Sequence, residues 1–386
     1  MKIDNPDYDN CCVNIIASVC KNFGLKPMHK TLPILDRELS KDYRNVVVIL
    51  LDGLGQSTLM RKLPEDSFLR SHFVQELSAV FPSSTTPSTV SYKSGLTPIE
   101  HGWWAHYLYL KEVGASINLY LNTDNYSKKQ LTKKHIAQNV MPYDNILDTI
   151  WENTPEDVHC YALCNRDSRD ETNVSQLVYE DLNEMCELIH SLVLNDGRKY
   201  IYAYHNFPDD LMHKEGPNSL TTERLLSDID AQLQVLCELC PDTLFIISSD
   251  HGQTEIMEVR DIADYPDLND CLLMPPNGLS RCFNFNIKPN RNKEFEKLAK
   301  KYFGDKFVLL SKKQVLDLGL LGRGTPHHKI DDTLGDYLLI AVDDCNLVIT
   351  TQYELPIIQP IGHHGGLTRE EMRVPLIVYG NKNKYW

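Results

Sequence analysis

Acidic and histidine side chains follow several hydrophobic segments of the chain, each at the point where a buried strand would end. They are Asp52 after VVVILL, Asp209 and His213 in PDDLMHKEGP, Asp250 and His251 in SSDHG, and His363 and His364 in IGHHGGLT. Carboxylate oxygens combined with imidazole nitrogens suit zinc, and suit manganese or iron less well. Each motif alone is commonplace, so the indication of a metal site comes from their recurrence at equivalent strand ends.

A second signal is the hydroxyl-rich segment FPSSTTPSTVSYKSG, residues 81–95. It predicts a short helix with Pro87 in its first turn and Gly95 after its end. Backbone N–H groups at a helix start favour anions, including phosphate. A hydroxyl there would lie near a phosphoryl group and could also bind a metal. Capping of the helix by Ser84, Thr85 or Thr86 is the alternative interpretation.

The elements that must position these residues alternate between strands and helices. Residues 44–51, 199–206 and 242–249 read as buried strands, and residues 181–197 and 220–240 read as helices. This alternation predicts an α/β fold, with a mostly parallel central sheet and helices on both of its faces. Ligands of such sheets bind at the carboxyl ends of the strands, where the acidic residues lie.

Residues 255–335 interrupt this alternation with PPNG, KPNRNKEF and the glycine-rich LGLLGRGTPHHK. We expect them to form an inserted cap subdomain. Residues 1–254 and 336–386 would then form the metal hydrolase core.

The charge balance limits the partners. The chain has 386 residues, with 39 Lys and Arg against 53 Asp and Glu, which gives a formal net charge of −14. A surface this negative repels long nucleic acids and anionic membranes. One small nucleotide in a metal-lined pocket remains compatible with it.

The cysteines and the first residues bear on location. The eleven cysteines are scattered, and MKIDNPDYDNCC lacks the basic start and apolar run of a secretory signal. We therefore expect reduced thiols and a cytoplasmic protein without a membrane span. The pair Cys237 and Cys240 could bind zinc, but it lies in a helical pattern without a partner pair and is interpreted as ordinary thiols.

Five ordered segments resemble the alkaline phosphatase superfamily, and within it the type I phosphodiesterase and nucleotide pyrophosphatase family. They are VVVILLDGLG, FPSSTTPSTVSYKSGLTPIEHG, NFPDDLMHKEGP, ISSDHGQ and HHGGLTREEMRVPLIVYG, which together span residues 46 to 379. The resemblance implies an alkaline phosphatase-like fold and two zinc ions bridged by the phosphoryl group. Manganese or another divalent metal is the alternative.

The resemblance also implies residue roles. It assigns one metal to Asp52, Thr85, Asp250 and His251, and the other to Asp209, His213 and His364. Thr85 occupies the family's nucleophile position, three residues after the proline of FPSST, and Ser84 and Thr86 are the alternatives. His364 is preferred to His363 because the family's histidine directly precedes glycine.

The chain departs from the family after HG, where phosphodiesterases tend to carry an asparagine that donates to a phosphoryl oxygen. Here the sequence is HGWWAHY, with His106 at that position. A histidine can donate the same hydrogen bond, so His106 is a candidate phosphoryl contact. Trp103 and Trp104 could stack on a base or another flat leaving group, with ordinary packing as the alternative.

The expected function is hydrolysis of a phosphodiester or phosphoanhydride in a small nucleotide-like substrate through a phosphothreonine intermediate. Metal coordination would activate the otherwise weak threonine nucleophile. The alternatives on the same site are phosphomonoester hydrolysis, phosphonate cleavage and phosphoryl-group transfer. A catalytically idle nucleotide-binding protein is the alternative of another class.

Overall fold

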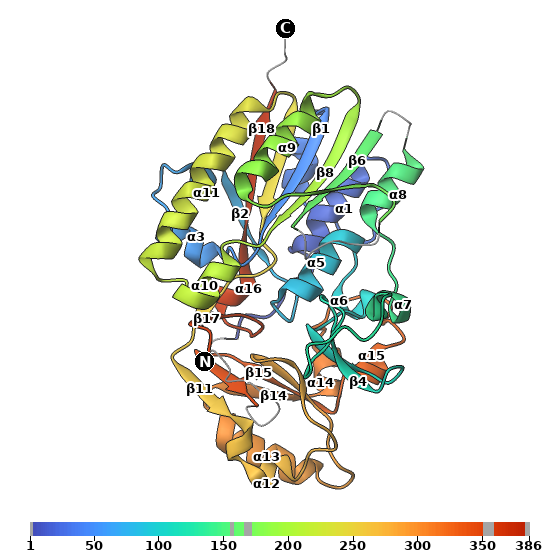
Figure 1. Ribbon diagram of the computed structural model, residues 1–386, viewed down its shortest axis with the longest axis vertical. Coiled ribbons are helices and arrows are strands. Elements are labelled where there is room, and N and C mark those ends of the chain that lie inside the picture. Colours follow the sequence, from blue (N-terminus) through green and yellow to red (C-terminus); the bar gives the residue numbers. More distant parts are fainter. Residues whose placement is uncertain (1–2, 155–157, 166–171, 350–358, 383–386) are drawn as a thin grey trace.

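The centre of the computed structural model, which describes residues 3–154, 158–165, 172–349 and 359–382, is a seven-stranded sheet (Figure 1). In spatial order its strands are β2 (Phe73–Ser78), β18 (Arg373–Asn381), β9 (Thr243–Ser248), β1 (Asn45–Leu51), β8 (Arg198–His205), β6 (Val158–Cys164) and β7 (Ser175–Val178). The strands from β9 to β7 are parallel, and β18 pairs antiparallel with both β9 and β2. The prediction of a mostly parallel central sheet is confirmed.

The continuous apolar run of β1 is explained by burial on both faces of the sheet. Val46, Val48 and Leu50 point into one hydrophobic core, whereas Val47 and Ile49 point into another. Side chains of a strand alternate between the two faces, so a strand covered on both sides needs apolar residues at every position.

Helices supply the other side of each core. The first core receives α1 (Cys12–Asn22), α2 (Pro33–Leu39), α5 (Thr85–Ser94), α6 (Pro98–His101), α7 (Ile136–Val140) and α8 (Ile146–Asn153). The second core receives α3 (Gln56–Lys62), α4 (Phe68–Ser71), α9 (Leu182–Leu194) and α11 (Leu220–Leu239). The predicted helices at 181–197 and 220–240 are confirmed as α9 and α11.

A second seven-stranded sheet lies below the first in Figure 1, with antiparallel neighbours throughout. Its order is β14 (Phe307–Ser311), β15 (Tyr337–Ala341), β13 (Cys282–Phe285), β12 (Asn277–Leu279), β3 (Tyr107–Leu110), β4 (Ala115–Asn118) and β5 (Thr123–Asp124). The helical segments of this region are η1 (Ile262–Asp264), α12 (Pro266–Asn269), α13 (Asn292–Phe303), α14 (Lys312–Asp317) and α15 (Ile330–Thr333).

The second sheet combines strands from distant parts of the chain. Strands β12 to β14 come from the predicted insert 255–335, whereas β3 to β5 and β15 come from outside it. In β15, Leu338 and Ile340 join the first core, while Leu339 and Ala341 join a third core with α13. One face of the second sheet is thus continuous with the core of the first. The exact domain limits stay a prediction.

Two further sheets have two strands each. β10 (Thr254–Glu255) pairs with β17 (Gly362–His363), and β11 (Glu258–Asp261) pairs with β16 (Cys345–Val348).

The two ends of α11 show no metal-binding feature. At its C-terminal end, Cys237 and Cys240 are buried thiols without a disulfide. At its start, the Ser219 side chain accepts a hydrogen bond from the Thr222 N–H as the N-cap. None of the helices in the described ranges is long and apolar enough to span a lipid bilayer.

Candidate two-metal centre

Three parallel strands bring their carboxyl ends together at one edge of the central sheet. Asp52 directly follows β1, and Asp250 and His251 follow β9. Asp209 begins α10 (Asp209–Glu215), shortly after β8. Because β1 lies between β8 and β9, these four side chains converge, and all four are buried.

The glycine after Asp52 permits this convergence. Gly53 adopts a left-handed φ of +76°, and a Cβ at its position would lie 2.8 Å from the Cβ of Asp209. Its N–H donates to Asp250 Oδ1 at 3.0 Å. The DG sequence therefore lets the backbone approach both neighbouring carboxylates.

The first cluster contains Asp52, Asp250 and His251, whose ligating atoms lie within 4.8 Å of one another. His251 Nε2 is 3.3 Å from Asp52 Oδ1 and 3.4 Å from Asp250 Oδ2. Burial, and then the nearby Asp250 carboxylate, raise the pKa of Asp52 well above its ordinary value. Burial raises the pKa of Asp250 to about 6. Without a cation, the site therefore opposes ionisation of its own carboxylates.

Two oxygen atoms of this cluster fit a metal ion. Asp52 Oδ1 and Asp250 Oδ2 are buried and have no hydrogen-bond donor among the described residues. A buried carboxylate oxygen without a donor is unfavourable, and a divalent cation removes that penalty. Two carboxylates and an imidazole are also the donor types that zinc accepts.

The second group of predicted ligands is Asp209, His213 and His364. His213 Nε2 lies 3.1 Å from Asp209 Oδ2, and His364 Nε2 lies 3.9 Å from Asp209 Oδ1. The structure brings these residues together in two overlapping sets, Asp209 with His251 and His364, and His213 with His363 and His364. The two predicted metal sites are therefore adjacent, because His251 of the first site and His364 of the second belong to the same set.

Electrostatics differ at the second group. Burial alone would raise the pKa of Asp209, but the charges of His213 and His364 outweigh it and hold this pKa well below its ordinary value. Burial likewise opposes the charged form of His213, yet the Asp209 carboxylate raises the pKa of His213 to about 9. In the metal-free protein the positive charge of protonated His213 thus balances the negative charge of Asp209, as a metal ion would.

The three predicted histidine ligands share one tautomer. In each, Nδ1 faces a backbone carbonyl oxygen: Gly362 at 2.8 Å from His213, Gly252 at 3.0 Å from His251, and Ser83 at 3.1 Å from His364. A carbonyl oxygen only accepts, so Nδ1 carries the hydrogen and donates it. In neutral His251 and His364, Nε2 then keeps its lone pair toward the carboxylates, as metal-binding histidines require. In His213 the same atom can bind a metal once the proton that it shares with Asp209 is displaced.

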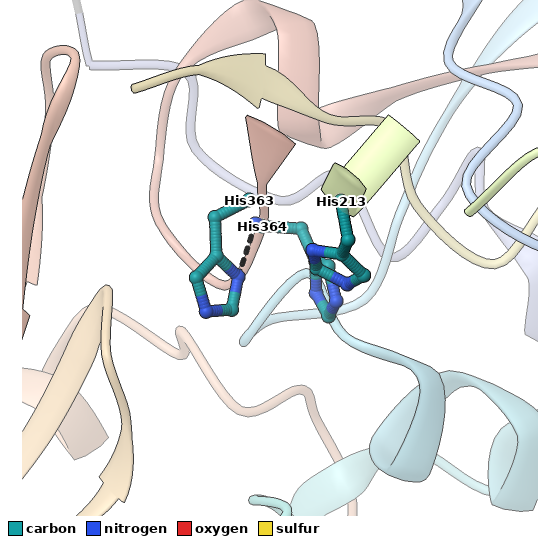
Figure 2. A group of neighbouring side chains, drawn as sticks. All are labelled: His213, His363 and His364. Carbon is teal, nitrogen blue, oxygen red and sulfur yellow. Dashed lines mark hydrogen bonds between the residues drawn. The ribbon is translucent and has the colours of Figure 1, made fainter. Parts of the chain in front are cut away.

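His363 behaves differently, as Figure 2 shows. Its Nδ1 accepts a hydrogen bond from the backbone N–H of His364 at 2.9 Å, so that lone pair is already engaged. The rings of His213 and His364 lie with their centroids 5.2 Å apart. The geometry therefore favours His364 over His363 as the ligand.

The three neighbouring hydroxyls at the start of α5 have different surroundings. Thr85 Oγ1 lies 3.2 Å from His251 Nε2 and donates to Asp52 Oδ2 at 3.4 Å. Ser84 Oγ is buried and has no hydrogen-bond partner among the described residues. Thr86 Oγ1 contacts His106 instead. Thr85 is thus the hydroxyl that meets the first cluster.

His106 and the two tryptophans, the candidate substrate contacts from the sequence, are held by protein partners. Both nitrogens of His106 are engaged, Nδ1 by Thr86 Oγ1 at 2.8 Å and Nε2 by Asn118 Nδ2 at 2.9 Å, so neither is open to a phosphoryl group. Trp103 and Trp104 are 3% and 0% exposed, and their ring N–H groups donate to the Met141 carbonyl and to Thr333 Oγ1. Their surroundings support packing rather than stacking on a substrate.

Arg281, which lies in the predicted insert, is held by a buried ion pair. It is fully buried and binds both carboxylate oxygens of Glu371, at 2.6 and 2.8 Å. Glu371 lies in α16 (Arg369–Met372), and its carboxylate also accepts a hydrogen bond from the Gly366 N–H at 2.8 Å. This ion pair therefore ties the second sheet to the segment that carries His364.

Sequence reasoning missed several residues at the centre. The Tyr204 hydroxyl donates to Asp52 Oδ2, and Gln253 Nε2 donates to Asp209 Oδ1. Ser88 Oγ donates to the Asp250 carbonyl oxygen at 2.9 Å. Tyr204 sits within an apolar strand whose pattern signals only burial. Of these three missed residues, only Gln253 lies beside a recognised motif, because it directly follows the DHG of the first cluster.

The chain matches one protein family and is similar to several solved structures. Residues 46–366 match the family "Type I phosphodiesterase / nucleotide pyrophosphatase". No curated protein matches the chain in sequence. Among solved structures, murine ectonucleotide pyrophosphatase/phosphodiesterase 5, inactive and in complex with AMP, is similar at a TM-score of 0.66 and 18% identity, over 88% of this chain and 89% of that one.

Two further structures share the fold. Human ectonucleotide pyrophosphatase/phosphodiesterase 5 has a TM-score of 0.65 and 17% identity, over 87% of each chain. Phosphonoacetate hydrolase from Sinorhizobium meliloti, in complex with phosphonoformate, has a TM-score of 0.61 and 17% identity, over 87% of this chain and 90% of that one. The match over residues 46–366 contains every candidate metal ligand. The chain belongs to the type I phosphodiesterase/nucleotide pyrophosphatase family.

Proposed function

We propose that this chain hydrolyses a phosphodiester or phosphoanhydride bond in a small nucleotide-like substrate, with Thr85 as the nucleophile at a two-zinc centre. The observation that carries the proposal is the position of Thr85 Oγ1, 3.2 Å from His251 Nε2 and 3.4 Å from Asp52 Oδ2. Thr85 is partly exposed and lies beside a buried cluster in which two carboxylate oxygens, Asp52 Oδ1 and Asp250 Oδ2, lack donors among the described residues.

The metal ligands follow from the donor atoms already described. Asp52, Asp250, His251 and Thr85 would hold one ion, and Asp209, His213 and His364 the other. When bound, two such cations lower the pKa of a coordinated hydroxyl and neutralise charge on phosphoryl oxygens. The arrangement supports this set because His251 and His364 present Nε2 with a free lone pair, because the Nε2 atom of His213 already faces the Asp209 carboxylate, and because Asp52 Oδ1 and Asp250 Oδ2 lack donors among the described residues.

The chain's own residues account for the bond changes. Thr85 Oγ attacks the phosphorus while the bond from phosphorus to the leaving oxygen breaks, and the leaving group departs with the bonding electron pair. The hydroxyl proton passes to Asp52 Oδ2, the acceptor that Thr85 already faces. A water oxygen then attacks the phosphothreonine, and Thr85 Oγ leaves with its bonding electron pair and recovers the proton from Asp52. The proton that the attacking water loses goes to the departed leaving oxygen, so one water has been added across the original bond.

The substrate class rests on two kinds of support. The family acts on phosphodiesters and pyrophosphates, and similar structures hold AMP or phosphonoformate, both small phosphorus-containing anions. The net charge of −14 argues for a small substrate rather than a long nucleic acid. Phosphomonoester and phosphonate hydrolysis and phosphoryl transfer use the same chemistry, so the experiment must separate them.

The experiment compares hydrolysis of bis-p-nitrophenyl phosphate and p-nitrophenyl phosphate by zinc-loaded protein, with metal-free protein as the control. A higher kcat/KM for the diester, which disappears on chelation and returns with zinc, is the expected result. A preference for the monoester would replace the proposal with a phosphatase. Inactivity on both, with two ions bound, would favour phosphonate cleavage, transfer or nucleotide binding without catalysis.

A further inference from the structure

His363 stands next to the second group of candidate metal ligands because β17 is tied to α10. The Ile361 N–H donates to the His213 carbonyl oxygen at 2.8 Å, and the Gly362 carbonyl oxygen accepts from His213 Nδ1 at 2.8 Å. Gly362 permits this approach, since a Cβ at its position would lie 2.6 Å from the Met212 carbonyl oxygen. The backbone that carries His363 is therefore fixed against a candidate ligand.

The ring of His363 lies beside the rings of two candidate ligands, as Figure 2 shows. Its centroid is 5.0 Å from that of His213, with an interplanar angle of 88°, and 5.3 Å from that of His364. One nitrogen from each of the three rings lies within 4.8 Å of the other two. A side chain in this position is close enough to contact a molecule bound at the second metal site.

The tautomer of His363 is opposite to that of the neutral candidate ligands His251 and His364. Its Nδ1 faces the backbone N–H of His364 at 2.9 Å, and a backbone N–H only donates. Nδ1 must then be unprotonated, so the ring carries its hydrogen on Nε2. His251 and His364 carry theirs on Nδ1, which donates to a carbonyl oxygen. His363 thus presents an N–H group where these two rings present a lone pair.

The Nε2–H group of His363 is available to a ligand. Among the described residues no acceptor lies within hydrogen-bond distance of it. His363 is partly exposed, and its Nε2 is not among the buried polar atoms that the fold encloses without a partner. Ser84 Oγ, at the start of α5, is such an enclosed atom. A substrate oxygen can therefore reach the His363 donor without any rearrangement of the described side chains.

The place of His363 matches the leaving side of the proposed reaction. In an in-line displacement the leaving oxygen lies on the side of the phosphorus opposite the attacking oxygen. Thr85 Oγ1 faces the first cluster, at 3.2 Å from His251 Nε2, whereas the His363 ring lies beside the second group. A phosphoryl group held between the two metal sites therefore turns its leaving oxygen toward the second group.

We propose that the Nε2–H group of His363 donates a hydrogen bond to the leaving oxygen of the substrate. This inference rests on the proposed function and adds a catalytic residue to it. The hydrogen bond stabilises the negative charge that grows on the leaving oxygen as its bond to phosphorus breaks, so it is stronger in the transition state than in the bound substrate. The hydrogen stays on Nε2 throughout, because the leaving oxygen takes its proton from the attacking water.

The first test varies the leaving group together with residue 363. Methyl phenyl phosphate and methyl p-nitrophenyl phosphate differ only in the leaving group, and a departing phenolate needs more stabilisation than a p-nitrophenolate. His363→Asn keeps an acceptor for the His364 N–H but is too short to bring a donor to the position of Nε2. We expect it to lower kcat/KM about 100-fold for the phenyl diester and at most about tenfold for the nitrophenyl diester. Equal losses, or no loss, would overturn the inference and leave the proposed function standing.

Two further variants control this test. His363→Gln extends an amide N–H to the reach of Nε2 and should recover most of the activity that His363→Asn loses. A glutamine variant as slow as the asparagine variant would contradict a role for the donor. His328 is an exposed histidine of the predicted insert, and His328→Asn should leave both rates unchanged. Both variants at position 363 should keep two equivalents of zinc, and loss of one would show that His363 is a metal ligand instead.

Two readouts on zinc-loaded protein do not require turnover and so separate this inference from the proposed function. Nitrogen NMR should show His363 protonated at Nε2, and protonation at Nδ1 alone would overturn the donor. Inorganic phosphate places one oxygen where the leaving oxygen lies, so calorimetry should show it binding to His363→Asn at least about fivefold more weakly than to wild type. Equal affinities would also overturn the donor. If the difference appears in a protein that hydrolyses neither diester, the proposed function fails and the donor stands.

Discussion

The imidazole rings of His251 and His364 lie nearly parallel, with centroids 3.7 Å apart and an interplanar angle of 18°. His251 belongs to the first cluster and His364 to the second, so this stacked pair forms the wall between the two candidate metal sites. Asp209 also reaches both rings. The two sites are therefore coupled through direct contact, and the first prediction concerns their metal content.

Loss of a ligand in the second site should empty that site. We expect Asp209→Asn and His364→Ala each to retain one equivalent of zinc instead of two, measured by elemental analysis after removal of free metal. The first cluster keeps its own Asp52, Asp250 and His251. His363→Ala is the matched control and should retain both ions, because its Nδ1 is used by the His364 N–H. Two equivalents in the Asp209 variant, or one in the control, would contradict the ligand set.

Replacement of the nucleophile should abolish turnover without unfolding the protein. Thr85→Ala is expected to lower kcat by about 10⁴-fold or more, since loss of a nucleophile removes the covalent route. Ser84→Ala is the control, because Ser84 Oγ makes no hydrogen bond to either cluster or to any other described residue. Kinetics should be measured alongside metal content and thermal unfolding. Loss of activity in the Ser84 variant, with Thr85→Ala active, would move the nucleophile by one residue.

Much of the metal centre could be predicted because its residues sit in local sequence patterns. Asp52, Asp250 and His251 each follow an apolar run that the central sheet buries, so strand prediction alone placed them at one edge. The choice of His364 over His363 came from the family pattern. Its physical reason, a backbone N–H that occupies His363 Nδ1, is visible only in three dimensions.

The second sheet could not be predicted, because its partners are far apart in the sequence. β3 pairs with β12, and short strands of three or four residues carry little periodicity. The contact of His106 with Asn118 was hidden for another reason, because the four-residue strands β3 and β4 that bring the two residues together carry little periodicity. Separation in the sequence also hid the burial of Arg281, whose partner Glu371 comes much later in the chain. An isolated arginine in a loop-like segment gives no sign of such a pair.

The buried pair of Arg281 and Glu371 should be important for stability. Arg281→Met leaves the Glu371 carboxylate buried without its partner, and we expect a loss of about 3–5 kcal/mol in the free energy of unfolding. Urea denaturation measures it. Lys313→Met is the control, since the pair of Lys313 and Asp317 is exposed and should contribute at most about 1 kcal/mol. Equal losses in the two variants would refute the role of the buried pair.

Buried neutral histidine should make the fold sensitive to acid. Burial lowers the pKa of His101 to about 3, and this ring accepts the Trp103 N–H at Nδ1. The pKa of His101 in the folded protein lies below the value of about 6.5 in the unfolded chain. The neutral ring therefore makes its full contribution to the free energy of unfolding above pH about 6.5, and this contribution is lost as the pH falls from there toward the folded pKa. At pH about 5 the loss should be about 2 kcal/mol.

His101→Asn removes the titrating group, so only the wild type loses stability through it at acid pH. The difference in the free energy of unfolding between wild type and variant should therefore narrow by about 2 kcal/mol between pH about 7.5 and about 5. Both proteins are compared without metal by urea denaturation, so that release of zinc does not enter the difference. A gap that stays constant over this range would show that His101 is not held neutral.

The most direct test of the central claim is the stereochemistry at phosphorus. A phosphorothioate diester of one configuration is hydrolysed by the zinc-loaded protein in isotopically labelled water, and the configuration of the product is determined. Attack by Thr85 followed by attack of water inverts the phosphorus twice, so the account predicts overall retention. Overall inversion would show that water attacks the substrate directly and that Thr85 is not the nucleophile.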